Sequence, residues 1–152
     1  MKKAILYLIV FTSILGCSSD KSISQNDRLF GEWKLMKFIS SDGTVLTAND
    51  FENSKDITIE FNTDFNYMGE TGYNDFFGSY SLNMGKDTKD TLILKKVHRS
   101  EANESGWGSL FFDKLRLNYD PSTQYTILFY QVRPTELRIF YSEDDYMYLE
   151  KR

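Results

Sequence analysis

The sequence has few of the residues that carry most enzyme chemistry or that cross-link small exported domains. Among its 152 residues there is one cysteine, Cys17, and one histidine, His98. A lone cysteine excludes an internal disulfide, so the fold must be held together by its core. Only two prolines are present and no segment repeats at a fixed period, which argues against a solenoid. The length suits one domain with a short appendage.

Runs of basic residues are also lacking. The chain has 18 lysines and arginines against 22 acidic residues, a net charge of −4. Residues 1–16 contain Lys2 and Lys3 and no acid, so the rest of the chain has 16 basic and 22 acidic side chains, or −6. This acidity argues against nucleic acid or an anionic lipid surface as a partner.

The only long apolar run lies at the N-terminus. Residues 4–11 are apolar, follow the basic start Met1-Lys2-Lys3 and precede Cys17, which is the layout of a secretory signal. The run is far shorter than the roughly 20 residues that span a bilayer. Ile14-Leu15-Gly16-Cys17 resembles the lipobox, in which a small residue precedes a lipidated cysteine. We therefore predict a signal peptide at 1–16 and lipid, palmitate included, on Cys17, where several acyl chains give a stable membrane anchor.

A polar segment separates the predicted anchor from the domain. Residues 17–28 contain almost no large apolar side chain, so they cannot bury enough surface to order themselves, and we expect a flexible tether. Ser18 stands where enteric-type bacteria place an inner-membrane retention aspartate. The predicted location is therefore the outer membrane of a Gram-negative bacterium, with a β domain at 29–152.

Period-two alternation predicts most of that domain as strands. In 56–61, for example, Ile57, Ile59 and Phe61 alternate with polar residues. Trp107, Phe111 and Leu115 instead recur every four residues and predict a helix within 102–117. The predicted fold is mainly β (α+β): a single antiparallel sheet of about seven to eight strands curled around one helix. The predicted strands are 29–39, 56–61, 65–68, 76–82, 91–97, 124–132, 136–141 and 146–150.

One motif stands out within the domain, with glycine, asparagine, glycine and tyrosine at Gly72, Asn74, Gly78 and Tyr80. Gly72 and Asn74 tolerate a left-handed backbone, so they predict a turn that enters a strand. Gly78 predicts a bulge or a close approach of another chain segment, and Tyr80 returns to the sheet.

With this motif the chain resembles the META domain family, which includes small bacterial heat-shock-type envelope lipoproteins. Residues 31–35 look like its opening strand, 104–115 like its helix and 137–141 like its penultimate strand. Many members have a cysteine where Tyr73 stands and another before the helix, and this chain has neither. The resemblance implies a sheet wrapped around a helix, a poorly defined role linked to the envelope, stress and drug tolerance, and no catalytic residues. It carries Gly72, Asn74, Gly78 and Tyr80 over as fold determinants only.

No pattern in the sequence predicts catalysis, a metal or another cofactor. His98 is alone, and no Gly-x-Ser-x-Gly motif accompanies it. Acidic loops at 83–90, with Asn83, Asp87 and Asp90, and at 143–145 do not match the ligand spacing of a calcium loop. Acidic loops of this kind are normally solvated.

Three functions stay open, led by a lipid-anchored, non-catalytic envelope protein of META-like type in stress tolerance. The second is a lipocalin-like carrier of a small apolar ligand, because Gly31-x-Trp33 matches the opening motif of lipocalins and an eight-stranded barrel leaves a small cavity. Against it, Thr63-Asp64-Phe65 follows Trp33 too closely for the second lipocalin motif, and a helix filling the sheet would leave no cavity. The third is a module that binds an envelope partner or inhibits a protease, suggested by large side chains on both faces of 125–130 and 146–148.

Overall fold

The structure is a computed structural model that describes residues 28–83, 89–100, 102–104 and 106–152. The predicted signal peptide, Cys17, nearly all of the predicted tether and Asp87 lie outside the described residues. Within the described part of the chain, no helix is long and apolar enough to cross a membrane.

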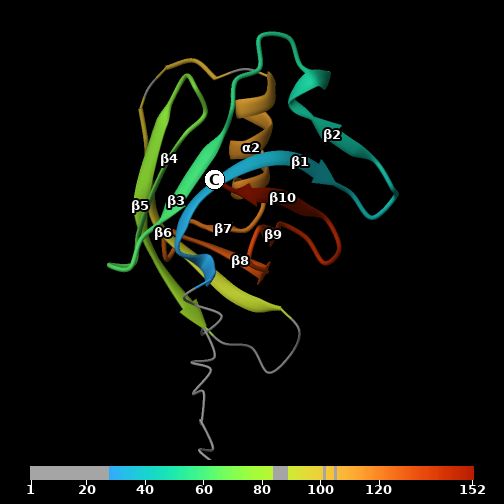
Figure 1. The fold of residues 1–152 in the computed structure, drawn as a ribbon. Coiled ribbons are helices and arrows are strands. Elements are labelled where there is room, and N and C mark those ends of the chain that lie inside the picture. Colours follow the sequence, from blue (N-terminus) through green and yellow to red (C-terminus); the bar gives the residue numbers. More distant parts are fainter. Residues whose placement is uncertain (1–27, 84–88, 101, 105) are drawn as a thin grey trace, which may run out of the picture.

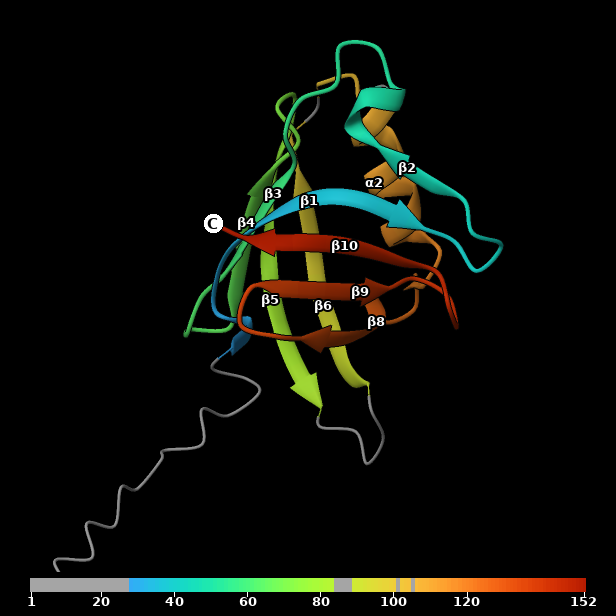
Figure 2. The same ribbon diagram turned by 45° about the vertical axis from the view of Figure 1, so that its right-hand side comes forward.

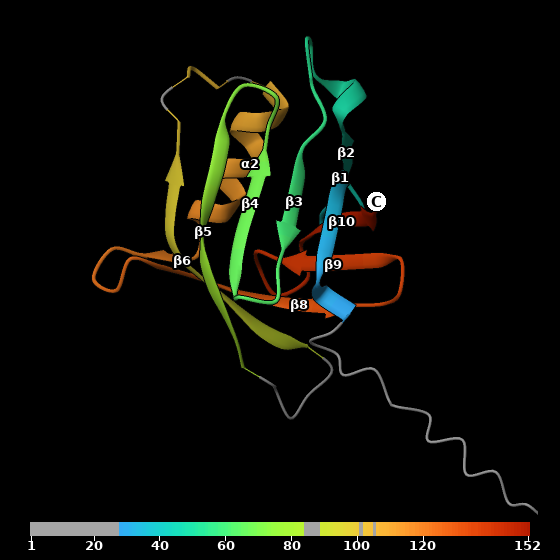
Figure 3. The ribbon, with the colours of Figure 1, turned by 60° about the vertical axis from the view of Figure 1, so that its left-hand side comes forward.

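Eight antiparallel strands form a closed barrel (Figures 1 and 2). The ring runs β1-β3-β4-β5-β6-β8-β9-β10, and the first and last strands close it by pairing Trp33 with Lys151 and Ile39 with Tyr146. In Figure 3, β3, β4 and β5 run upright, whereas β8, β9 and β10 cross them. The ring strands are β1 (Gly31–Ile39), β3 (Thr58–Phe61), β4 (Asn66–Glu70), β5 (Asp75–Asn83), β6 (Asp90–Arg99), β8 (Tyr125–Val132), β9 (Glu136–Phe140) and β10 (Tyr146–Lys151).

Three short elements lie outside this ring. Strand β2 (Val45–Thr47) pairs with the end of β1 and leads into the 3-10 turn η1 (Ala48–Asp50). Strand β7 (Tyr119–Asp120) pairs with the start of β8. The helix α2 (Gly106–Arg116) connects β6 to β7.

The predicted class, mainly β with an antiparallel sheet and one helix, is confirmed. The sheet also closes into a barrel, which the prediction did not specify. The predicted strands match the ring strands to within about two residues, and the helix starts one residue before Trp107. Strands β2 and β7 were not predicted. Strand β7 lies at Tyr119–Asp120, just after the segment predicted to contain the helix.

Alternating side chains fill the barrel. In β8, buried Thr126, Leu128 and Tyr130 alternate with more exposed residues, as the two faces of a strand require. At the end where β1 begins, the buried Trp33 indole N–H donates to the carbonyl oxygen of Leu29 at 2.7 Å, and Leu29 is itself fully buried. One continuous apolar cluster therefore runs through the molecule.

Helix α2 fills the opposite end of the barrel (Figure 1). Trp107 packs edge-on against Phe38 at the end of β1, with ring centroids 4.9 Å apart. Phe111 and Phe112 both contact Phe76 at the start of β5, with centroid distances of 5.2 and 5.6 Å. The helix is thus held by aromatic packing, which stabilises it far more than intrinsic propensity does.

Candidate functional site

A cleft lies where the barrel wall is interrupted. Strands β6 and β8 pair only as far as Lys95 and Tyr125, but β6 continues to Arg99 with β5 as its one partner strand. Figure 3 shows β6 continuing past the β7–β8 hairpin, alongside α2. Between these elements is a cleft of about 670 Å³, which we call the helix groove. Its lining residues are Lys96, Val97, His98, Arg99, Phe112, Leu115, Arg116, Tyr119, Gln124 and Thr126.

The floor of the helix groove is apolar. Phe112 and Leu115 are each 5% exposed, and their residual surface faces the groove from α2. Val97 is half-buried on the β6 side, and Tyr119 is exposed at the rim. A cleft of this size with an apolar floor and polar rim has the form of a small-molecule site.

The rim of the groove is cationic. Among the described residues, none of Lys96, Arg99 and Arg116 has an acidic group within ion-pair distance. The Arg99 guanidinium lies 5.2 Å from the centre of the Phe112 ring, an arrangement that favours a cation over an aromatic face. His98 also lines the groove, exposed and stacked on Phe77 at a centroid distance of 5.3 Å. The sole histidine is thus placed beside the cleft.

The backbone is unusual at the same place. Lys96 and Gln124 have φ angles of 53° and 58°, in the left-handed region that non-glycine residues seldom adopt. They face each other across the parting strands, and the Lys96 N–H donates to the carbonyl oxygen of Gln124 at 3.4 Å. Such costly conformations cluster at functional sites. Two of the four described non-glycine residues with positive φ therefore lie at the helix groove.

Gly72 and Asn74 lie away from the groove, in the turn between β4 and β5. The predicted turn into a strand is present: Gly72 has φ of +80°, whereas Asn74 is not among the described residues with positive φ. The Asn74 side chain is buried and makes several hydrogen bonds. Its amide nitrogen donates to Glu104 Oε2 at 2.7 Å and to the carbonyl oxygen of Ala102 at 2.9 Å. Ser100 Oγ donates to its Oδ1 at 3.0 Å. Asn74 therefore joins the turn to the segment that leads into α2.

Gly78 and Tyr80 lie in β5. The β5–β6 register shifts between Phe77 and Ser79, so Gly78 sits at a bulge. A Cβ there would be 2.6 Å from the carbonyl oxygen of Lys95 and 2.7 Å from the Tyr67 hydroxyl. The buried Tyr80 hydroxyl donates to the carbonyl oxygen of Asn62 at 2.8 Å, and burial raises its pKa to about 12. These contacts join neighbouring strands rather than line a binding site.

The acidic loop at 143–145 forms a hydrogen bond with a neighbouring turn. Asp145 Oδ1 accepts a hydrogen bond from the Ser41 N–H at 2.7 Å, and this bond lowers the pKa of the Asp145 carboxyl. Among the residues the structure describes, no group of three or more His, Cys, Asp or Glu side chains is close enough to hold a metal ion.

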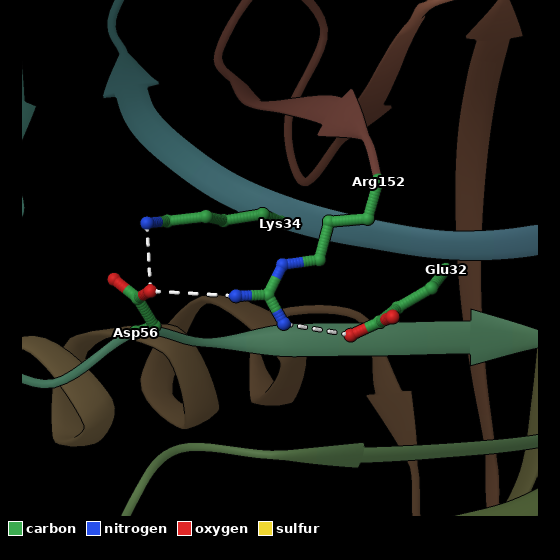
Figure 4. Close-up of polar contacts among 4 residues, drawn as sticks. All are labelled: Glu32, Lys34, Asp56 and Arg152. Atoms are coloured by element: carbon green, nitrogen blue, oxygen red, sulfur yellow. Dashed lines mark hydrogen bonds and ion pairs between the residues drawn. The ribbon is translucent and has the colours of Figure 1, made fainter.

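A second cleft, of about 530 Å³, lies on the outer face of β1, β3, β4 and β5, and we call it the acidic cleft. Its lining includes Glu32, Glu60, Glu70 and Asp75, together with Met68 and Phe77. Arg152 offsets negative charge at one edge of this cleft (Figure 4). Its guanidinium is 2.9 Å from Glu32 and 3.7 Å from Asp56. Lys34 also contacts Asp56, at 2.7 Å.

No family model and no curated protein matches the chain. Two solved structures are similar to it. An NMR structure of a protein from Burkholderia xenovorans is 21% identical, with a TM-score of 0.54 over 80% of this chain and 81% of that one. The crystal structure of a lipocalin-like protein from Bacteroides uniformis is 19% identical, with a TM-score of 0.50 over 82% of this chain and 99% of that one. At these identities the likeness concerns the fold, which is thus lipocalin-like.

Proposed function

We propose that this chain is a non-catalytic, lipocalin-like carrier of a small apolar ligand and that the ligand binds in the helix groove. The observation that carries the proposal is the apolar floor of Phe112, Leu115 and Val97, which is open to solvent where β6 parts from β8. Burying an apolar ligand on this floor removes water from both surfaces, which is the main source of affinity in such sites.

The groove suits this role better than the barrel interior does. The lipocalin alternative drawn from the sequence expects a cavity enclosed by the strands. Here Trp33, Phe61 and Tyr67 are almost fully buried inside the barrel, and the Phe61 ring packs against Tyr67 and Tyr80. With α2 filling one end as well, the space for a ligand lies beside the helix.

A neutral fluorescent probe, N-phenyl-1-naphthylamine, tests the proposal. We expect the probe to bind the chain with increased emission, and Leu115→Gln to lower its affinity at least tenfold by placing a polar group in the floor. Leu117→Gln is the matched control, because Leu117 is only two residues away but exposed and outside the groove lining.

A second pair of variants guards against a loss of folding in Leu115→Gln. Tyr119→Ser changes an exposed residue of the groove rim, whereas Phe129→Ser changes a similarly exposed residue on the outer face of β8. We expect only Tyr119→Ser to weaken probe binding. Equal effects of the two changes, or no probe binding to the unmodified chain, would contradict the proposal.

We further propose that the carrier works from a membrane, anchored by lipid on Cys17. The proposal is supported by the leader and lipobox in the sequence. In the structure, β1 starts at the barrel end opposite α2, so an anchor ahead of β1 leaves the helix groove at the far end (Figures 1 and 3). Cys17→Ser should release the chain from membranes without unfolding it. Retention in the membrane fraction after a carbonate wash would refute the anchor.

A META-like role in envelope stress tolerance is the second candidate. It is supported by the Gly72–Tyr80 segment, whose turn, buried Asn74 and bulge join β4, β5 and the approach to α2. A strain lacking the chain should then survive heat or envelope stress less well, and Leu115→Gln should restore survival fully. Restoration by the unmodified chain alone would favour the carrier.

A further inference from the structure

We infer that the ligand of the helix groove is an amphipathic anion, with an apolar tail on the groove floor and an anionic head at Arg99 and Arg116. This inference rests on the proposed carrier function and adds the chemical class of the ligand. It is drawn from the way two clefts meet at these arginines.

Another cleft, smaller than the acidic cleft and distinct from it, adjoins the helix groove. It measures about 390 Å³ and shares Arg99, Phe112 and Arg116 with the helix groove. Beyond these shared residues its walls are mostly polar, and we call it the head cleft. Its other lining residues are Ser100, Ala102, Asn103, Glu104, Ser109 and Asp113. The two arginines thus stand at a boundary between an apolar space and a polar one.

A molecule with both characters fits across that boundary. Its tail would cover Val97 and Leu115 and remove their surface from water. Its head would reach the guanidinium groups and then the hydroxyl of Ser109, which can donate a hydrogen bond to an anion. A neutral apolar molecule would use only the first of these two spaces.

The charges favour a negative head. Arg99 and Arg116 have no acidic partner within ion-pair distance among the described residues, and a guanidinium presents paired donors that match a carboxylate or phosphate. Of the two acids in the head cleft, Glu104 accepts hydrogen bonds at Oε2 from the side chains of Asn74 and Thr71, and its Oε1 has no partner among the described residues. Asp113 is exposed, where solvent screens its repulsion.

A set of ligands with one tail and different heads tests the inference. Dodecanoate, dodecyl phosphate and dodecanol, each below its micelle-forming concentration, would compete with N-phenyl-1-naphthylamine for the full-length Cys17→Ser chain. We expect at least one anion to bind about tenfold more tightly than dodecanol, which corresponds to about 1.4 kcal/mol. Comparing dodecanoate with dodecyl phosphate shows whether the preferred head is a carboxylate or a phosphate. The preference should shrink as salt is added.

Charge variants locate the head. The double change Arg99→Gln and Arg116→Gln should abolish the preference for anions and leave the affinity for dodecanol within about twofold. Arg138→Gln is the matched control, because Arg138 lies on β9 beside the Tyr146 ring and outside both clefts. It should leave every affinity unchanged.

The outcomes separate this inference from the proposed function. Equal binding of all three ligands would overturn the anionic head and leave the apolar carrier standing. A preference that survives the double change would place the anion elsewhere and also overturn the inference. If the probe binds but none of the three ligands displaces it, the inference fails. If the probe itself does not bind, the carrier function fails as well.

Discussion

The helix groove and the acidic cleft are both surface hollows with charged rims, but they are built differently. The acidic cleft lies on the outside of β1, β3, β4 and β5, whose ladder pairs continuously from Glu32 through Glu60 and Met68 to Phe77. The helix groove lies where the ladder ends, because β6 continues beyond its last pair with β8. The first is a hollow in a complete wall, and the second is a gap in the wall.

Under the proposed function, this difference explains why the helix groove and not the acidic cleft binds the apolar ligand. In a complete ladder the inward-facing side chains stay enclosed, so the acidic cleft exposes carboxylates and the outward-facing side chains of Met68 and Phe77, but no core residue of the helix. At the gap, core residues of α2 reach the surface: Phe112 and Leu115 belong to the apolar cluster and also form the groove floor. A charged rim is common to both clefts and so does not distinguish the proposed site. The interruption of the sheet does distinguish it.

The largest expected effect comes from removing the packing that holds α2 over the gap. Phe111→Ala should destabilise the fold by about 3–5 kcal/mol, because Phe111 is buried against Phe76. Leu117→Ala, at an exposed position, should change stability by less than about 0.5 kcal/mol. Urea unfolding measures both. Similar values for the two would mean that α2 is not held by the core.

The β5–β6 ladder should be intolerant of added volume at its bulge. Gly78→Ala places a methyl group within 2.8 Å of two backbone carbonyl oxygens, those of Lys95 and Lys96, which cannot move independently of the ladder. We expect a loss of about 1–3 kcal/mol, again by urea unfolding. Ser79→Ala, one position along, should cost much less. An unchanged Gly78→Ala protein would show that the bulge adapts freely.

Two buried tyrosines, one in β4 and one in β5, should make the fold sensitive to alkali. Burial raises the pKa of Tyr80 from 10 to about 12 and raises that of Tyr67 further. A raised pKa in the folded state means full stability below pH 10 and loss above it, by about 1.4 kcal/mol per pH unit for each such tyrosine. Tyr67→Phe should make this decline shallower. Because the Tyr67 hydroxyl has no hydrogen-bond partner among the described residues, the change should cost little at pH 7. An unchanged slope would contradict the account.

The smallest expected effect separates paired from unpaired arginines. Arg152→Gln removes the contacts with Glu32 and Asp56 at the acidic cleft and should cost less than about 1 kcal/mol, because these groups are exposed. The cost should shrink in high salt. Arg116→Gln removes no ion pair within the described part of the chain and should leave stability within about 0.5 kcal/mol. A larger loss from Arg116→Gln would show that this cation serves the fold.

Much of the fold could be predicted from local pattern, and closure of the barrel could not. Alternation in Ile57, Ile59 and Phe61 and the four-residue spacing in α2 are local signals of burial. Closure depends on β1 pairing with β10, which joins Trp33 to Lys151, and no local pattern encodes that contact. Strands β2 and β7 are too short for alternation to register.

The candidate site was hidden for a related reason. Lys96, Arg99 and Arg116 are ordinary polar residues of a strand and a helix, and no run of basic residues in the sequence points to them. Only the path of α2 past the end of β6 gathers them around one apolar floor. The motif at Gly72–Tyr80 was conspicuous in the sequence, yet its residues lie in the framework and not in the groove.

A crystal structure of the chain soaked with dodecanoate would test the central claim most directly. We predict electron density between α2 and β6, with the carboxylate within hydrogen-bond distance of Arg99 or Arg116 and the alkyl chain over Leu115. Density for the ligand inside the barrel or on the acidic cleft, with the helix groove filled only by solvent, would contradict the account.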